Sequence, residues 1–248
     1  MLGSNKKVGL LVPPGNNVIE NDFRKWLPDS VDLHSNVMYW DFNQHRSSEQ
    51  RLLDLGDHVE ESVRVLTLKP VDVVAFGCTG GSFLNGIGYD HDIASRIETA
   101  SGSSRAVVTA TAVVSALNHL KVERVAVCTP YDWDFEFLNG ALRAFYTQAG
   151  FKIVNFAVDR RGLGEVDTGP TPHDVAVELA QRVDHPQADA VFMSCTGFLG
   201  AADVIDELEN MLGKPVVTSN QATFWACMKE VGFEATIPGG GVLLAQLA

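Results

Sequence analysis

The chain has 248 residues, of which 46% are hydrophobic and 20% charged, so it contains enough apolar material for a sizeable folded core. Its formal net charge of −12, with no Lys/Arg-rich stretch to offset it, makes nucleic acids and anionic membrane surfaces unfavourable partners. No apolar run reaches the roughly 18 residues of a membrane span, and the first residues lead into a strand pattern rather than a signal-peptide core. We therefore expect a cytoplasmic protein.

Short Val-rich runs alternate with longer helical patterns along the chain, which is typical of repeated β-α units and a mainly parallel sheet. We expect strands near 7–12, 32–38, 71–77, 105–109, 124–129, 152–158, 189–194 and 215–219. We expect helices near 17–26, 48–68, 90–100, 111–120, 133–149, 172–184, 201–212 and 221–231. The pattern predicts an α/β fold with two flavodoxin-like halves, each a four-stranded mainly parallel sheet flanked by helices.

An internal repeat supports this division. Cys78 and Cys195 each end an apolar run in Cys-Thr-Gly, and the shift that superposes them also lays Val8–Pro13 on Val125–Pro130. We infer two halves of common ancestry, residues 1–120 and 121–248, related by a pseudo-twofold axis, with a C-terminal tail that can pack back on the first half. Equivalent strand ends then face each other across a cleft, so Cys78 is expected opposite Cys195 in an active site between the halves.

The two cysteines are the candidate chemical groups. Four cysteines without a C-x-x-C or Cys/His cluster predict reduced thiols and no metal site. A thiolate is a strong nucleophile and a competent carbon base, and the Thr-Gly after each cysteine can aim backbone N–H groups at it. The alternative is that a cysteine at a strand end is simply a small buried residue, but its duplication in one motif argues against that. Cys128 and Cys227 lack this context and are assigned to the core.

Further polar residues follow the carboxyl ends of strands, where open parallel sheets bind ligands. Asn16 and Asn220 can hold a carboxylate, although capping the next helix explains an amide there equally well. The Tyr131 hydroxyl can donate to an anion or anchor its loop. The candidate substrate-binding residues are Asn16, Thr79, Gly80, Tyr131, Thr196, Gly197 and Asn220.

These segments resemble the aspartate/glutamate racemase superfamily over nearly the whole chain, and within it the branch of maleate cis-trans isomerases and arylmalonate decarboxylases. Val8 to Asn16 looks like the opening strand and asparagine loop of that branch, and Phe76–Phe83 and Met193–Gly197 look like its two active-site loops. Thr129-Pro-Tyr131 matches its tyrosine loop, and Val217-Thr-Ser-Asn220 its late strand end.

The resemblance implies a cofactor-independent enzyme that forms an enolate-like intermediate next to a carboxylate. Decarboxylases of this branch keep only the second cysteine, whereas both are present here, as in isomerases and racemases. One departure is that Gly164-Glu-Val166-Asp167 is closer to the decarboxylase pattern. Related folds often dimerise, which is compatible with a homo-oligomer, but the sequence marks no interface.

The leading hypothesis is isomerisation of maleate or a related small cis-enedioate. Cys78 would add to the double bond, Cys195 would act as proton donor, and Asn16 and Asn220 would orient the carboxylates. The same thiols could instead act as two bases in a racemase of an amino or hydroxy acid. An arylmalonate-type decarboxylase and a non-enzymatic binding protein for small acids complete the alternatives.

Overall fold

The central strands of the first sheet, β1 and β3, are largely apolar and buried, as expected where helices cover both faces of a sheet. The computed structural model describes residues 5–40, 47–131, 135–159 and 171–247. Parallel strands lie in the order β2-β1-β3-β4, namely β1 (Lys6–Val12), β2 (Val31–Val37), β3 (Val73–Phe76) and β4 (Arg105–Val108). The helices here are α1 (Ile19–Trp26), α2 (Ser48–Asp57), α3 (Val59–Leu66), α4 (Thr79–Phe83), α5 (Tyr89–Ser101) and α6 (Thr109–His119).

The second sheet repeats this arrangement. Its parallel strands lie in the order β6-β5-β7-β8, namely β5 (Arg124–Thr129), β6 (Lys152–Val158), β7 (Ala190–Met193) and β8 (Val216–Thr218). The helices are α7 (Glu136–Gln148), α8 (Pro172–Val183), the short η2 (Ala201–Asp203), α9 (Ile205–Leu212), α10 (Ser219–Glu230) and α11 (Gly241–Ala245). The predicted α/β fold with two four-stranded parallel sheets is confirmed, and the strand order is flavodoxin-like in both.

Several helix boundaries differ from the sequence prediction. The helix expected over 48–68 is two helices, α2 and α3, which meet at His58 just after Gly56, where a side chain would collide with the Tyr89 hydroxyl. The glycine-rich α4 was not predicted. Helix α10 begins at Ser219, because Thr218 and Gln221 form a capping box that fixes its start. Asn220 therefore lies in the first turn of a helix and not in a loop.

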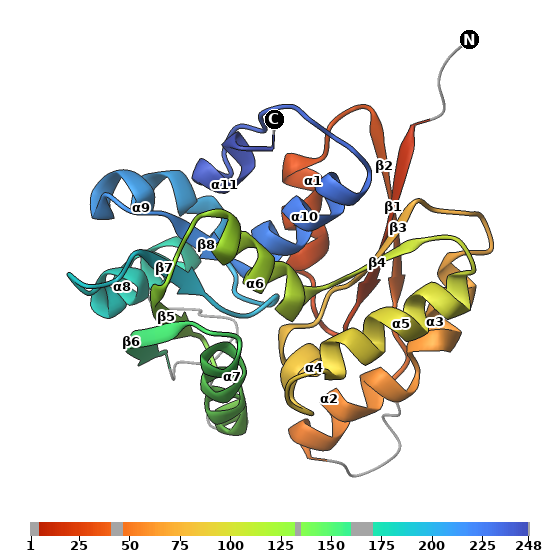
Figure 1. The fold of residues 1–248 in the computed structure, drawn as a ribbon, viewed down its shortest axis with the longest axis horizontal. Coiled ribbons are helices and arrows are strands. Elements are labelled where there is room, and N and C mark those ends of the chain that lie inside the picture. Colours follow the sequence, from red (N-terminus) through yellow and green to blue (C-terminus); the bar gives the residue numbers. More distant parts are fainter. Residues whose placement is uncertain (1–4, 41–46, 132–134, 160–170, 248) are drawn as a thin grey trace.

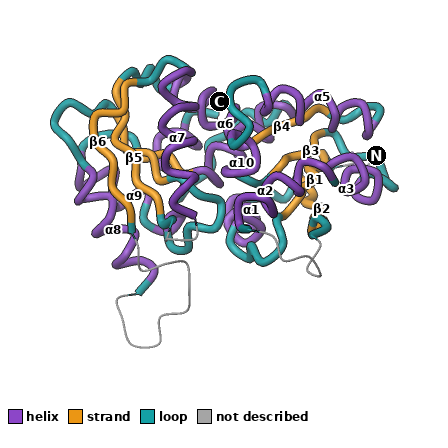
Figure 2. The backbone as a smooth tube through the Cα atoms, turned by 90° about the horizontal axis from the view of Figure 1, so that it is seen from below, coloured by secondary structure: helices purple, strands orange, loops and turns teal. Residues whose placement is uncertain are grey.

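Equivalent helices of the two repeats meet between the sheets, as Figures 1 and 2 show. Helix α6 follows β4 and helix α10 follows β8, and they pack against each other, with the Thr223 hydroxyl donating to the Thr109 hydroxyl at 3.1 Å. The C-terminal segment returns to the first sheet, since the Trp26 indole N–H donates to the Gly239 carbonyl at 3.0 Å. The division into residues 1–120 and 121–248 stays a prediction.

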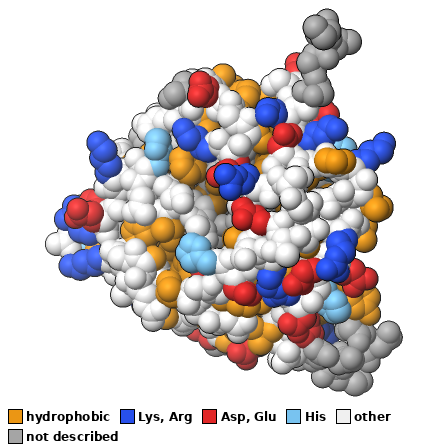
Figure 3. Space-filling model, turned by 45° about the vertical axis from the view of Figure 1, so that its right-hand side comes forward, with side chains coloured by type: hydrophobic (Ala, Val, Ile, Leu, Met, Phe, Trp, Pro, Cys, Tyr) orange, Lys and Arg blue, Asp and Glu red, His pale blue; other side chains and the backbone are white. Residues whose placement is uncertain are grey.

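Acidic and basic side chains are interspersed over the face drawn in Figure 3. Within the described ranges, no helix combines the length and the apolar character needed to cross a membrane.

Candidate active site

A cavity of about 270 Å³ lies at the carboxyl ends of the strands of both sheets. Residues that follow β1, β3, β5 and β7, the central strands of the two sheets, line this cavity. The predicted site residues that line it are Asn16, Cys78, Thr79, Gly80, Tyr131, Cys195, Thr196 and Gly197. The two cysteines of the repeated motif therefore border one common space. Asn220 is not among the residues that line this cavity.

Cys78 is the N-cap residue of α4, so its side chain stands where the first backbone N–H groups of a helix are unpaired. The Gly81 N–H donates to its sulfur at 3.2 Å. A side chain at residue 81 would place its first carbon 3.0 Å from that sulfur, so glycine is what allows this close approach. The thiol is 4% exposed, and burial raises its pKa to about 12, against the lowering effect of the Gly81 N–H.

Cys195 sits in a strained turn after β7. Its backbone has φ of 136°, a conformation that residues with a side chain rarely adopt. Its N–H donates to the Ser219 hydroxyl at 3.0 Å, and its sulfur accepts the Gly197 N–H at 3.3 Å. The residue is only partly buried, and burial raises the pKa of its thiol to about 11, opposed by the Gly197 N–H and by Tyr131.

Thr196 is held from two directions. The Asn16 amide donates to its hydroxyl at 3.0 Å, while the Asn16 oxygen accepts the N–H groups of Val18 and Ile19 at the start of α1. The Asn220 amide donates to its carbonyl oxygen at 3.0 Å. Asn16 thus caps the start of α1 and also lines the cavity. Asn220 does not line the cavity and instead holds the backbone of the segment that follows Cys195, here called the Cys195 loop. Substrate contact by Asn220 stays a prediction.

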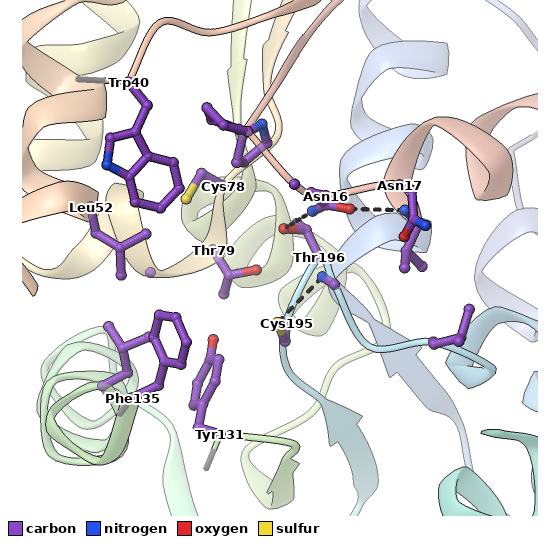
Figure 4. A pocket seen from close by; sticks show the side chains of 18 residues that line it. Asn16, Asn17, Trp40, Leu52, Cys78, Thr79, Tyr131, Phe135, Cys195 and Thr196 are labelled. Atoms are coloured by element: carbon purple, nitrogen blue, oxygen red, sulfur yellow. Dashed lines mark hydrogen bonds between the residues drawn. The ribbon is translucent and has the colours of Figure 1, made fainter. Parts of the chain in front are cut away.

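Two hydroxyls are buried beside the thiols. Thr79 is 1% and Tyr131 3% exposed, and neither hydroxyl has a hydrogen-bond partner among the described residues. The Tyr131 hydroxyl nevertheless lies close enough to Cys195 to lower the pKa of that thiol. In Figure 4 it points toward Thr79 in the space between the two cysteines. A buried hydroxyl without a partner costs about 1–3 kcal/mol, so these groups are poised to bind a polar ligand.

An apolar wall lies on the side of Cys78 away from Asn16, as Figure 4 shows. Sequence analysis did not find it, because its residues look like core positions of distant elements. For Trp40 a signal existed, since it follows the carboxyl end of β2 at the ligand-binding edge. The residues that form this wall are Trp40, Leu52, Phe135 and Leu138.

The cavity holds polar donors without formal charges. Among the described residues that line it there is no Lys, Arg, His, Asp or Glu. Nor does any group of three or more His, Cys, Asp or Glu side chains lie in position to hold a metal ion within the part of the chain that the structure describes. All four cysteines are free thiols, and Cys128 and Cys227 are fully buried in the core, as predicted. The arrangement offers two thiols and several N–H and O–H donors for developing negative charge.

Comparisons with known proteins agree with this geometry. The chain is 28% identical to arylmalonate decarboxylase of Bordetella bronchiseptica over 249 residues, covering 98% of each protein. It is 25% identical to maleate isomerase of Nocardia farcinica over 248 residues, covering 97% of this chain and 96% of that protein. A solved structure of a Nocardia farcinica maleate cis-trans isomerase mutant with a covalently bound succinylcysteine intermediate matches with a TM-score of 0.85 at 23% identity, covering 97% of this chain and 98% of that one.

A sequence model of the family described as arylmalonate decarboxylase matches residues 8–244, which is nearly the whole chain. The segment Gly164-Glu-Val166-Asp167, which bears on the two branches of the resemblance, lies outside the described residues. The matched range includes both Cys-Thr-Gly loops and every other residue that lines the cavity. The chain belongs to the arylmalonate decarboxylase family.

Proposed function

We propose that this protein is a cofactor-independent cis-trans isomerase of maleate or a related small cis-enedioate. The observation that carries the proposal is that Cys78 and Cys195 border one cavity together with the buried hydroxyls of Thr79 and Tyr131. A decarboxylation needs one proton donor, whereas addition and elimination at a double bond need a nucleophile as well. Two thiols at one site supply both groups.

In the proposed reaction the Cys78 thiolate adds to one carbon of the double bond. The sulfur–carbon bond forms, and the π electrons move onto the carboxylate attached to the other carbon, giving an enediolate. The former double bond is then single, so the two carbons rotate about it. When the electron pair returns, the double bond re-forms in the trans geometry and the sulfur–carbon bond breaks, which regenerates the thiolate.

The donors of the cavity would stabilise the charge that builds up on the carboxylate oxygens. We assign this role to the hydroxyls of Thr79, Thr196 and Tyr131 and to the N–H groups of Gly80 and Gly197, with Asn16 orienting a carboxylate. Cys195 would donate its proton to the enediolate and take it back before elimination. Charge stabilisation by fixed donors is the largest expected contribution.

The relatives support this chemistry. A maleate isomerase resembles the chain along its whole length, and the Nocardia farcinica isomerase structure holds a cysteine bonded to a succinyl group. A succinylcysteine is what the proposed addition gives if the intermediate acquires a proton on carbon.

The experiment is an NMR assay of maleate with the wild-type protein. Formation of fumarate, abolished in Cys78→Ala and retained in the control Cys128→Ala, is the expected result, since Cys128 is a buried core thiol outside the cavity. The same assay in deuterated water with one enantiomer of an α-substituted acid tests the racemase alternative. Exchange and inversion there, with no fumarate from maleate, would replace our proposal by that one.

A second candidate function is favoured by the apolar wall of Trp40, Leu52, Phe135 and Leu138. Such a wall can bind an aryl or alkyl substituent, and the family includes an arylmalonate decarboxylase at 28% identity. An arylmalonate in the same NMR assay separates the two. Loss of CO₂ that survives Cys78→Ala and disappears in Cys195→Ala would identify decarboxylation with the second thiol as proton donor.

A further inference from the structure

Helix α1 of the first sheet contacts α10 and η2 of the second sheet, the two elements next to the Cys195 loop. The Asp22 carboxylate accepts a hydrogen bond from the Asn220 amide at 2.6 Å. One turn further, the Lys25 ammonium donates to the Ala202 carbonyl at 3.1 Å and to the Asp203 carboxylate at 2.8 Å. These contacts join residues that are far apart in sequence, so they hold α10 and η2 against helix α1 of the first sheet.

Asn220 links Asp22 to the Cys195 loop through a single amide nitrogen. That nitrogen donates both to Asp22 and to the Thr196 carbonyl, and both partners are acceptors, which fixes the orientation of the amide. The Asn220 side chain is 2% exposed, and its oxygen has no partner within the described ranges. The amide is therefore held toward its two acceptors although its oxygen stays unpaired.

The residue before Thr196 needs such support. Cys195 has a strained φ of 136°, and strain of this kind costs about 1–3 kcal/mol and persists only where the surroundings impose it. Asn220 holds the carbonyl of the next residue, and Ser219 accepts the N–H of Cys195 itself. If these contacts loosened, the turn could relax, and the thiol would leave the Gly197 N–H and the cavity.

We infer that Asp22 is a positioning residue, which acts through Asn220 and the Thr196 carbonyl to keep the Cys195 thiol in its strained place in the cavity. As a role in catalysis, this rests on the proposed function. The charge on Asp22 matters for the strength of the contact, because a carboxylate accepts a stronger hydrogen bond than a neutral group. Burial raises the pKa of Asp22 to about 7, with Asn220 and Lys25 opposing the shift and Asp203 adding to it.

The test compares Asp22→Asn with Asp22→Ala. Asparagine keeps a neutral acceptor of nearly the same shape, whereas alanine removes the acceptor. The readout is the rate of iodoacetamide alkylation of Cys195 relative to Cys78 in the same molecules, followed by mass spectrometry. We expect the Cys195 to Cys78 ratio to rise about tenfold or more in Asp22→Ala and only a few-fold in Asp22→Asn, from the strengths of charged and neutral hydrogen bonds.

The pH profile gives a second readout that simple packing would not move. Burial raises the pKa of both thiols well above neutral pH, so their alkylation ratio should change near pH 7 only if Asp22 controls the loop. The wild-type ratio should resemble that of Asp22→Asn below pH 7 and fall below it above pH 7, while the variant stays flat. If Asp22→Ala does not fold, this profile in wild type and Asp22→Asn still decides.

Isomerase kinetics and a matched control complete the design. We expect Asp22→Ala to lower kcat about tenfold with little change in KM, and Glu20→Ala, at a solvent-accessible ion pair on the same helix, to leave both unchanged. A wild-type ratio in Asp22→Ala, or equal ratios in Asp22→Asn and Asp22→Ala, would overturn the inference. Because alkylation needs no substrate, a protein that never isomerises maleate but shows the expected ratios would refute only the proposed function.

Discussion

The two Cys-Thr-Gly loops occupy equivalent places in the two sheets, yet their backbones differ. After Cys78 the chain enters helix α4 at once, and the third residue, Gly81, donates its N–H to the sulfur. After Cys195 the third residue is Phe198, and its N–H donates to the Cys195 carbonyl at 3.2 Å instead. The same tripeptide occurs twice, but the N–H that reaches the sulfur belongs to the third residue after Cys78 and to the second residue after Cys195.

This difference suggests a division of labour. Cys78 is relaxed, with φ of −132°, and the Gly81 N–H that donates to its sulfur favours the thiolate, against the larger, opposite effect of burial on its pKa. Cys195 is strained, and the next residue, Thr196, is held by Asn16 from the first sheet's side and by Asn220 from the second's. A nucleophile must bond to substrate carbon and leave again, whereas a proton donor must stay at a fixed distance. The helical loop fits the first task and the clamped turn the second.

Removing each thiol in turn is the strongest test of this comparison. Cys78→Ala should lower kcat for maleate isomerisation on the order of 10⁴-fold or more, because the variant loses the proposed nucleophile and the other thiol of the cavity, Cys195, is assigned to proton transfer. Cys195→Ala should cost about 10²- to 10⁴-fold, the usual contribution of a general acid. Steady-state kinetics with both variants measures the ratio. Equal losses, or a larger loss at Cys195, would contradict the assignment.

Loss of the Tyr131 hydroxyl is expected to lower kcat about 10²-fold, which corresponds to about 3 kcal/mol, since it is a fixed donor next to Cys195. Its hydroxyl is buried without a partner, so Tyr131→Phe should lower kcat while leaving the thermal midpoint unchanged or raising it. Tyr146→Phe is the matched control, because that hydroxyl is also buried and unpartnered but does not line the cavity. It should change stability in the same direction without affecting kcat. A parallel loss of activity in both variants would remove Tyr131 from the site.

Gly81→Ala tests the Cys78 loop, because it disturbs the hydrogen bond from the Gly81 N–H to the Cys78 sulfur. The added carbon would lie 3.0 Å from the Cys78 sulfur, so the thiol or the N–H must shift. We expect a loss of about tenfold in kcat, equivalent to one hydrogen bond to a charged sulfur. Gly140→Ala, on helix α7 with open space around it, is the control. Full activity in Gly81→Ala would show that this N–H does not support the thiolate.

The sequence predicted that the two cysteines share a site, but it could not predict how their loops differ. The repeat predicted that Cys78 and Cys195 share a site, because parallel strands place their carboxyl ends at one edge. The strain at Cys195 could not be predicted, since it depends on contacts with Ser219 and Asn220 from another strand end. The Asp22–Asn220 pair was missed for the same reason, because nothing near either residue in sequence marks the other as its partner.

The apolar wall shows a different limit. Leu52 and Leu138 have the periodicity of ordinary helix faces, and such a pattern cannot distinguish a side chain that packs in a core from one that lines a cavity. Helix α4 was missed because five residues with two glycines carry no helical periodicity. In contrast, the capping box of Thr218 and Gln221 was a readable local signal that places Asn220 inside a helix.

The smallest expected effect concerns only the clamped loop. Asp22 has a pKa of about 7 in the folded protein, against an ordinary value of 3.8, so the folded state disfavours its charge. Its contribution to stability is therefore fully present below pH 4 and is lost as the pH rises through 7. Asp22→Asn should match the wild-type Tm near pH 4 and exceed it by a few degrees at pH 8.

Thermal unfolding at several pH values, with Glu20→Gln as the control on the same helix, measures this difference. A Tm gap between wild type and Asp22→Asn that does not grow with pH would mean that the carboxylate is not destabilised by burial. If the gap does grow, the wild-type protein keeps a charge that weakens its fold at neutral pH. The charge on Asp22 lowers the free energy of unfolding, but it also strengthens the hydrogen bond from Asn220. The strained Cys195 thiol is then held in place at the expense of overall stability.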